Sequence, residues 1–205
     1  MKQVDRSHYE FGSYMSKGRW NSVWHQLEET MSLNPRSVLE VGPGPGTFKS
    51  IGKSFGLDIK TFDLDPDLEP DFVGSATSMP LSDDQFDIVC AFQVLEHLPY
   101  EDALLAFAEM ARVSNSHIIL SLPDAKPVWR YRIFVPKFGN IDRLIARPFW
   151  KPVEHKFDGQ HYWEVNKLGY DLDKIQRDFS AYGKLIKSYR VAENPYHRFF
   201  VFQIK

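Results

Sequence analysis

The sequence is poor in cysteine, in long apolar runs and in net charge. Cys90 is its only cysteine, so an internal disulfide is excluded. No apolar run reaches the roughly 20 residues that cross a bilayer, and the polar residues 1–6 lack the apolar core of a signal peptide. We therefore expect a cytoplasmic protein without a transmembrane segment. The formal net charge of -2 provides no general attraction to nucleic acid or membranes.

Length and composition fit one globular domain. The chain has 205 residues, of which 43% are hydrophobic and 15% aromatic, and this is enough for a complete core. We assign residues 1–205 to a single domain that begins with a helical cap at 1–33. Apolar residues recur in the cap at helical spacing, and Asn34-Pro35 ends the helix. The aromatic residues between Tyr9 and Trp20 either pack within the cap, which we favour, or form a flap over a ligand.

Strand-like runs alternate with helical segments after the cap. Five apolar runs predict strands, at 37–41, 59–62, 72–74, 86–92 and 116–122. Helical segments are expected at 46–55 and 100–113. This alternation predicts an α/β fold with a doubly wound parallel sheet. A helix at 168–182 and two further strands, 184–191 and 198–204, end the chain like a hairpin, so we expect one antiparallel strand near the sheet edge.

Segment 124–166 lacks a clear periodicity. Between Lys126 and Phe157 it contains eight lysines and arginines, two acidic residues and seven aromatic residues. An insertion of this length without regular structure usually forms a lid or binding loop, so we expect a substrate lid after the fifth strand. Its cations and rings favour a small-molecule substrate that is anionic, aromatic or lipid-linked, although they also fit a solvated face. Nucleic acid is disfavoured because the whole chain is slightly acidic.

The first predicted strand runs into a loop with glycines at alternate positions, Gly42, Gly44 and Gly46. Glycine lets the backbone turn tightly and approach a ligand closely. Prolines lie between the glycines and lack the N–H donors that a pyrophosphate needs. The third glycine of the dinucleotide fingerprint would fall on Thr47. The loop therefore favours a ligand without phosphates and disfavours an NAD-dependent dehydrogenase.

The run from Val38 to Gly46, Val-Leu-Glu-Val-Gly-Pro-Gly-Pro-Gly, resembles motif I of the class I S-adenosylmethionine (SAM) methyltransferases. The segment Val94–Leu98, Val-Leu-Glu-His-Leu, is similar to a segment of the methyltransferase type 11 group. The resemblance covers residues 37–123 well and 168–204 in outline. It implies a Rossmann-like, seven-stranded, mostly parallel sheet with one antiparallel strand. It also implies that SAM is the cofactor and S-adenosylhomocysteine the product.

The resemblance assigns cofactor contacts to the first two strands and the loops after them. The glycine loop would hold the methionine part of SAM, and Glu40 would fix the loop and the amino group. Asp63 ends the second strand, about 20 residues beyond the glycine loop, where a carboxylate can accept both ribose hydroxyls. Asp65 and Asp67 are close competitors for this role. Leu64 is expected to pack on adenine.

Further cofactor contacts are expected after the third and fourth strands. Many relatives have Gly-Asp-Ala where this chain has Gly74-Ser75-Ala76. Ser75 therefore replaces the carboxylate that meets the adenine amino group in those relatives, and a hydroxyl or backbone groups would have to serve, with Ala76 beside it. Phe92 and Gln93 end the fourth strand, at the edge where parallel sheets bind ligands.

Two histidines are candidates for proton transfer. His161 precedes the last long helix, where type 11 relatives often place a histidine and an aromatic residue, and it is our first candidate for a general base. His97 is the second candidate, with a structural hydrogen bond as the alternative. Methyl transfer by alignment alone, with His161 only packing, is also open. No metal site is expected, because the histidines lack the paired spacing of a zinc site.

The sequence thus predicts a SAM-dependent methyltransferase. The reaction would be an in-line displacement that moves the methyl group to an O, N or C atom of a small-molecule acceptor. The alternative is a non-catalytic SAM-binding protein that acts as a regulator or partner subunit. The acceptor and the oligomeric state are left open.

Overall fold

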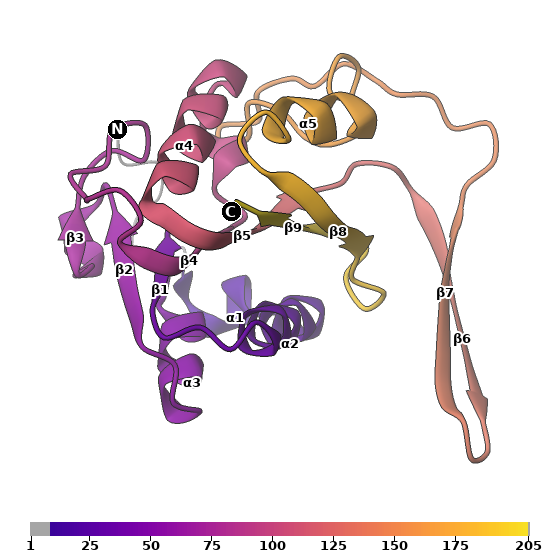
Figure 1. Cartoon of the computed structure of the whole chain (residues 1–205). Coiled ribbons are helices and arrows are strands. Elements are labelled where there is room, and N and C mark those ends of the chain that lie inside the picture. The colour runs from indigo at the N-terminus through magenta and orange to yellow at the C-terminus, as the bar shows by residue number, and fades with distance from the viewer. Residues whose placement is uncertain (1–8, 205) are drawn as a thin grey trace.

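A computed structural model describes residues 9–204, which form a seven-stranded sheet with the strand order β3-β2-β1-β4-β5-β9-β8 (Figure 1). The strands are β1 Val38–Val41, β2 Ile59–Asp63, β3 Phe72–Val73, β4 Phe86–Phe92, β5 Ser114–Pro123, β8 Lys184–Arg190 and β9 His197–Gln203. Strands β1 to β5 pair in parallel, and β9 is antiparallel to both β5 and β8. The predicted sheet with one antiparallel strand is confirmed. That strand lies next to the edge strand β8.

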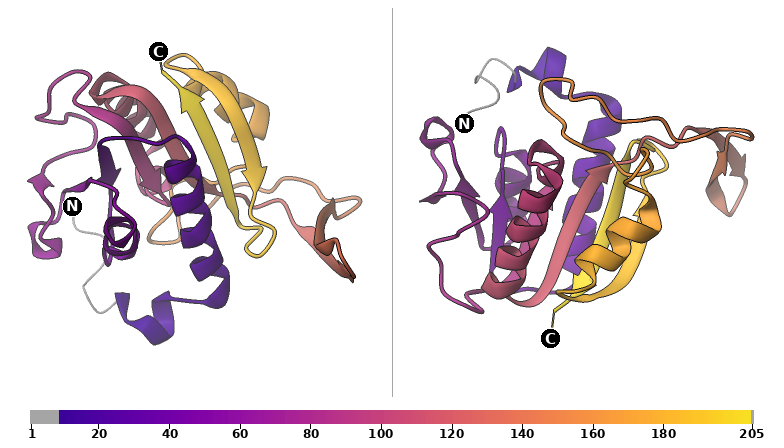
Figure 2. Two further views of the ribbon diagram at one scale, coloured as in Figure 1. Left: turned by 60° about the horizontal axis from the view of Figure 1, so that its bottom comes forward. Right: turned by 90° about the horizontal axis from the view of Figure 1, so that it is seen from above.

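Helices cover both faces of this sheet (Figures 1 and 2). They are α1 Phe11–Tyr14, α2 Lys17–Ser32, α3 Thr47–Ser54, α4 Tyr100–Val113 and α5 Leu172–Phe179, with short 3-10 helices η2 Pro66–Leu68 and η3 Leu95–His97. On one face, α4 and α5 pack through Phe107 and Phe179, whose rings stack at 4.6 Å between centroids. On the other face, Leu27 of α2 and Phe48 of α3 enter a second apolar core. Among residues 9–204, none of the helices combines the length and apolar character that crossing a bilayer requires.

Capping residues make two helices shorter than the sequence pattern indicated. Within the predicted helical cap, the chain breaks at Ser16, whose side chain accepts the N–H of Arg19 at 3.1 Å and caps α2. Asp171 likewise caps α5 by accepting the N–H of Lys174 at 2.9 Å, after Gly169 has turned the chain with a φ of 83°. The predicted helix at 168–182 therefore begins too early, and α5 also ends before residue 182, at Phe179. Residues 1–8 of the predicted cap lie outside the described residues.

The expectation of no regular structure in segment 124–166 was wrong. The segment contains an antiparallel hairpin of β6 Val128–Val135 and β7 Gly139–Ala146. Lys137 and Gly139 close its turn with φ values of 72° and 78°. Figure 1 shows that the hairpin projects away from the sheet. Apolar and polar residues alternate from Trp129 to Ile133 in β6 but not along β7. Rings and charges occur on both faces of the hairpin, so the alternation that marks a half-buried strand does not extend over both strands.

Ion pairs tie the base of the hairpin to the β8–β9 connection. Arg132 donates to Glu193 at 2.9 Å, and Arg130 lies 3.4 Å from the same carboxylate. Asp142 bridges the two arginines from the facing strand, at 2.9 Å from Arg130 and 3.0 Å from Arg132. Two cations of the basic segment are therefore already paired within the protein.

Candidate functional site

The three glycines of the loop after β1 all adopt left-handed backbone conformations. Their φ values are 67° for Gly42, 53° for Gly44 and 73° for Gly46. A Cβ on Gly42 would lie 2.6 Å from a methyl group of Val94, and a Cβ on Gly44 would lie 3.2 Å from the ring of Tyr9. Only glycine satisfies both the dihedral angles and this close approach. The loop is thus held tightly against the β4–η3 connection.

Two tyrosines from the start of the described chain lie against this loop. The rings of Tyr9 and Tyr14 meet edge to face at 5.1 Å between centroids, and both lie within contact distance of the space above Gly44. Arg19 lies over the Tyr14 ring at 4.0 Å. The sequence favoured packing within the cap over a flap for these aromatic residues. The structure places Tyr9 and Tyr14 beside the glycine loop, where a flap over a ligand would lie.

Glu40 is buried directly before the glycine loop. Its neighbours across the sheet are Thr61 of β2 and Cys90 of β4, and the residue is only 4% exposed. Its Oε2 atom has no hydrogen-bond partner in the part of the chain that the structure describes. Burial raises the pKa of Glu40 to about 8, against the opposing charge of Lys49. A buried acceptor with an unused oxygen suits a donor or cationic group of a ligand.

Asp63 lies at the carboxyl end of β2, as the sequence predicted. It is half-buried, burial and the nearby Asp65 raise its pKa, and its Oδ1 accepts the N–H of Asp65 at 2.8 Å. Asp65 in turn caps η2 by accepting the N–H of Asp67 at 3.0 Å. Leu64, between them, is 51% exposed. Of the three acidic residues, Asp63 is the one at the strand end beside the glycine loop.

The residues after β3 and at the end of β4 make contacts within the protein. The hydroxyl of Ser75 lies 2.8 Å from that of Thr77, and Ala76 packs against the core. The Phe92 ring meets Phe48 edge to face at 5.2 Å, so part of it belongs to the second core. Gln93 adopts a φ of 58° and its backbone N–H donates to the carbonyl of Ser121 at 2.9 Å. This strained conformation turns the chain from β4 toward η3.

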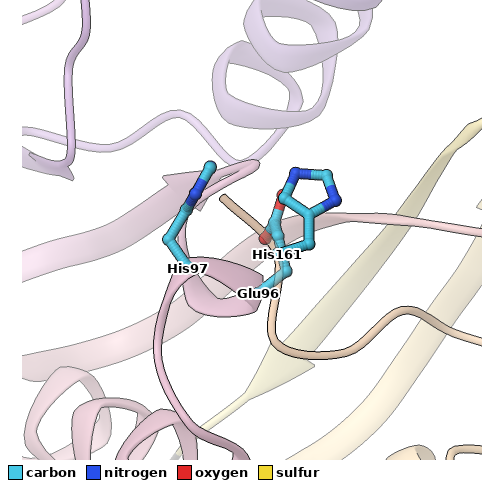
Figure 3. Close-up of side chains that lie close together, drawn as sticks. All are labelled: Glu96, His97 and His161. Atoms are coloured by element: carbon cyan, nitrogen blue, oxygen red, sulfur yellow. The ribbon is translucent and has the colours of Figure 1, made fainter. Parts of the chain in front are cut away.

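Tertiary structure brings the two candidate histidines together. Their ring centroids are 5.0 Å apart, at an interplanar angle of 75°. The Nδ1 atom of His97 lies 3.1 Å from the backbone oxygen of Gln160, and Nδ1 of His161 lies 3.1 Å from a carboxylate oxygen of Glu164. Figure 3 shows both rings beside the carboxylate of Glu96. Residues 153–166, the return segment of the insertion, therefore complete a polar cluster on η3.

Three acidic residues set the electrostatics of this cluster. Glu96 is fully buried, and neither of its carboxylate oxygens has a hydrogen-bond partner among residues 9–204. Burial raises the pKa of Glu96 to about 8, although His161 favours its charged form. Burial lowers the pKa of His161, but Glu164, Glu96 and Asp158 outweigh it, so the net direction is upward.

Sequence reasoning did not assign Glu96, Glu164 or Tyr196 to the site. The Tyr196 hydroxyl donates to Glu164 at 2.5 Å and so holds the carboxylate that orients His161. The one local signal was the acidic residue next to His97. Tyr196 lies in the β8–β9 connection, far along the chain, and no local pattern indicates its position.

A family model described as "Methyltransferase domain" matches residues 13–183. The chain belongs to the class I SAM-dependent methyltransferases. An uncharacterized methyltransferase of Mycobacterium bovis (strain BCG / Pasteur 1173P2) is 31% identical over 117 residues, which are 51% of this chain and 42% of the relative. One from Mycobacterium sp. (strain KMS) is 26% identical over 128 residues, with 58% and 47% covered. The matches thus span less than half of these mycobacterial relatives.

Solved structures share the fold of this chain over most of its length. A protein of Pyrococcus horikoshii OT3 has a TM-score of 0.64 at 16% identity and covers 98% of this chain and 100% of its own. The 1,6-didemethyltoxoflavin-N1-methyltransferase of Burkholderia thailandensis, with bound 1,6-didemethyltoxoflavin and S-adenosylhomocysteine, has a TM-score of 0.62 at 14% identity, with 98% and 87% covered. At such identities the likeness concerns the fold.

Replacing Gly42 by Ala tests the contact between the glycine loop and Val94. We expect Gly42→Ala to lose about 1–2 kcal/mol from the left-handed backbone, plus the cost of the clash with Val94. Gly46→Ala is the matched control, because its φ is 73° but nothing lies within 4 Å of a Cβ there. Urea unfolding of both variants measures the difference. Equal losses of stability would contradict the close contact.

The raised pKa of Glu40 predicts a pH dependence of stability. Because the folded pKa is about 8, above the ordinary 4.5, the stability linked to this proton is present below pH 4.5 and is lost as pH rises toward 8. Each such carboxyl contributes a slope of up to about 1.4 kcal/mol per pH unit. Urea unfolding between pH 5 and 9 should therefore show a smaller decline for Glu40→Gln than for the unaltered protein. Parallel declines would show that Glu40 ionises normally.

Proposed function

We propose that this chain binds SAM and transfers its methyl group to a small-molecule acceptor. The observation that carries the proposal is the glycine loop itself. Three left-handed glycines follow a buried carboxylate with an unused oxygen, in a chain that belongs to the SAM-dependent methyltransferases. Several solved structures of the same fold contain S-adenosylhomocysteine, among them a glycopeptide N-methyltransferase and the magnesium protoporphyrin IX methyltransferase of Synechocystis PCC 6803.

The residues on this edge of the sheet fit the parts of such a cofactor. Backbone groups of the glycine loop would hold the methionine part, and Glu40 would accept from its amino group. Asp63 would accept the ribose hydroxyls, and the exposed side chain of Leu64 would cover the adenine with Ala76. The hydroxyl of Ser75, or the backbone beside it, would meet the adenine amino group. Phe92 and Gln93 would border the methyl group.

The chemistry that SAM supplies when bound is an activated methyl group, which the acceptor takes by in-line displacement with S-adenosylhomocysteine as the product. What the protein adds is alignment and exclusion of water. Tyr9 and Tyr14 lie where they would cover the donor side of the site. His97 and His161 lie on the side of the return segment, where an acceptor would enter.

We assign the role of general base to His161, with His97 as the second candidate. The carboxylate of Glu164 lies 3.1 Å from Nδ1 of His161 and fixes the ring. The Tyr196 hydroxyl holds that carboxylate in place. A histidine oriented by an acidic residue can take the proton that an alcohol or phenol loses as it attacks the methyl group.

The insertion supports a substrate with anionic, aromatic or lipid-linked character. In the hairpin register, Trp129 faces Ile145, and Tyr131 faces Arg143, so rings, an aliphatic chain and a cation share one face. Both tryptophan and tyrosine are about half exposed there. The return segment 153–166 borders the histidines and would act as the lid.

Replacing Asp63 by Ala tests the cofactor site. Loss of a carboxylate that accepts two hydroxyls should weaken S-adenosylhomocysteine binding about 10- to 100-fold. Asp67→Ala is the matched control. Asp67 was an alternative candidate for the ribose site in the sequence, but it lies on η2 and not at the end of β2. Titration calorimetry measures both, with NAD as a ligand that should not bind. Unchanged affinity in Asp63→Ala would remove Asp63 from the site.

Replacing His161 by Ala tests the base. Turnover should fall about 10²- to 10⁴-fold, while affinity for S-adenosylhomocysteine stays within about twofold. A panel of alcohol, phenol and amine acceptors, followed by release of S-adenosylhomocysteine, provides the assay. His25→Ala is the control, since His25 lies on α2 against Tyr189. Equal rates would reduce His161 to a packing role, and cofactor binding without turnover on any acceptor would favour a non-catalytic SAM-binding regulator.

A further inference from the structure

We propose that Glu96, His97 and His161 together bind a divalent transition-metal ion. Each offers one ligand atom, and these three atoms all lie within 4.8 Å of one another. The residues come from two distant parts of the chain, η3 and the return segment of the insertion. Figure 3 shows the carboxylate of Glu96 next to the His161 ring, with the ring of His97 on the other side of the cluster.

The state of Glu96 is the first support for this site. A buried carboxylate normally has a cationic or hydrogen-bonding partner, because removing a charge from water is costly. Asp124 follows that rule, with Arg198 at 2.7 Å, and so does Glu29, with Lys187 at 2.5 Å. Glu96 is as buried as Asp124, yet both of its oxygens lack a hydrogen-bond partner within the described part of the chain. A bound cation would satisfy both oxygens.

The hydrogen bonds of the two histidines are the second support. Metal-binding histidines usually use their other ring nitrogen to bond a carboxylate or a backbone carbonyl, which fixes the ring. Nδ1 of His161 lies 3.1 Å from the Glu164 carboxylate, and Nδ1 of His97 lies 3.1 Å from the carbonyl of Gln160. These are the two kinds of partner that such ligands have. We therefore assign the Nε2 atoms to the ion.

The fold holds both ligand segments against each other. The N–H of Tyr162 donates to the carbonyl of Glu96 at 2.8 Å. Asp158 accepts the N–H groups of Gln160 and His161, at 2.9 and 2.8 Å. The three ligand atoms must approach from their present separation to the about 3.4 Å that metal–ligand bonds of about 2.0–2.1 Å allow.

The types of ligand indicate which metal ions suit the site. Two imidazoles and one carboxylate suit Zn²⁺, Mn²⁺ or Fe²⁺, whereas Ca²⁺ and Mg²⁺ prefer oxygen ligands. Three protein ligands leave coordination positions open, as in catalytic rather than structural sites.

The ion would also specify the acceptor, and this step rests on the proposed function. An open position beside the methyl donor favours an acceptor with a hydroxyl oxygen. The ion would lower the pKa of that hydroxyl, whose proton leaves to water. The oxygen–carbon bond then forms as the sulfur–carbon bond breaks. With the ion bound, His161 is a metal ligand and not the general base assigned above, and the ion takes over the removal of the proton, so the metal titration decides between the two roles of His161.

Metal titration of the whole chain tests the site directly. The protein is stripped with a chelator, dialysed, and titrated by calorimetry with ZnCl₂ and with MnCl₂. We expect one ion to bind per chain. Glu96→Gln and His161→Ala should each weaken binding by at least about 10- to 100-fold, the loss that follows even when an outer partner of a ligand is removed. His25→Ala should bind as the unaltered chain does.

Two further measurements separate loss of the metal site from loss of folding and from loss of cofactor binding. Circular dichroism shows whether Glu96→Gln folds, and Co²⁺ added to the unaltered chain should produce visible absorption bands that Glu96→Gln lacks. S-adenosylhomocysteine binding is measured on the same samples. A chain that binds S-adenosylhomocysteine but neither metal, or one whose metal affinity is the same in Glu96→Gln, overturns the metal site and leaves the proposed methyl transfer standing.

Discussion

The contact between Gly42 and Val94 holds the candidate site together. It joins the loop after β1 to the loop after β4, and a Cβ on Gly42 would come within 2.6 Å of Val94. Because β1 and β4 are parallel neighbours, both loops leave the sheet at the same edge. The first loop presents the glycines and follows Glu40, and the second continues into Glu96 and His97. The residues that we propose for the cofactor and for the acceptor are thereby set side by side.

Four of the five buried acidic residues among residues 9–204 fall into two groups, and the fifth, Glu164, is held by His161 and Tyr196. Asp124 and Glu29 are paired with arginine or lysine: Asp124 joins the end of β5 to β9, and Glu29 joins α2 to β8. Glu40 and Glu96 each keep at least one buried oxygen without a partner among the residues described, and burial raises the pKa of both to about 8. Both lie at the edge of the sheet where parallel strands bind ligands. Unpaired burial is a cost that a ligand or ion would remove, and this is why we place the function there.

The insertion after β5 has two parts with different roles. The β6–β7 hairpin extends from the body of the protein (Figure 2) and is tied to it by Arg130 and Arg132 through Glu193. The return segment instead packs on η3 and supplies His161 and Glu164. From the sequence, we expected segment 124–166 to form one lid, whereas the structure divides it into these two parts. In the proposed function, the hairpin face is available for acceptor contacts, and the return segment carries the proposed base.

Local sequence determined the strands of the parallel sheet, the glycine loop and the family, because each rests on residues close together in the chain. Alternating apolar runs set β1 to β5, and the left-handed turns require Gly42, Gly44 and Gly46 where they stand. The bounds of two helices were misjudged because side-chain hydrogen bonds of Ser16 and Asp171 set where α2 and α5 begin. The β6–β7 hairpin was missed because the alternation of apolar and polar residues does not extend over both of its strands. Only the tertiary structure placed His161 beside His97 and buried Glu96 next to them. Contacts between residues that far apart depend on the packing of the return segment on η3, and no local pattern encodes that packing.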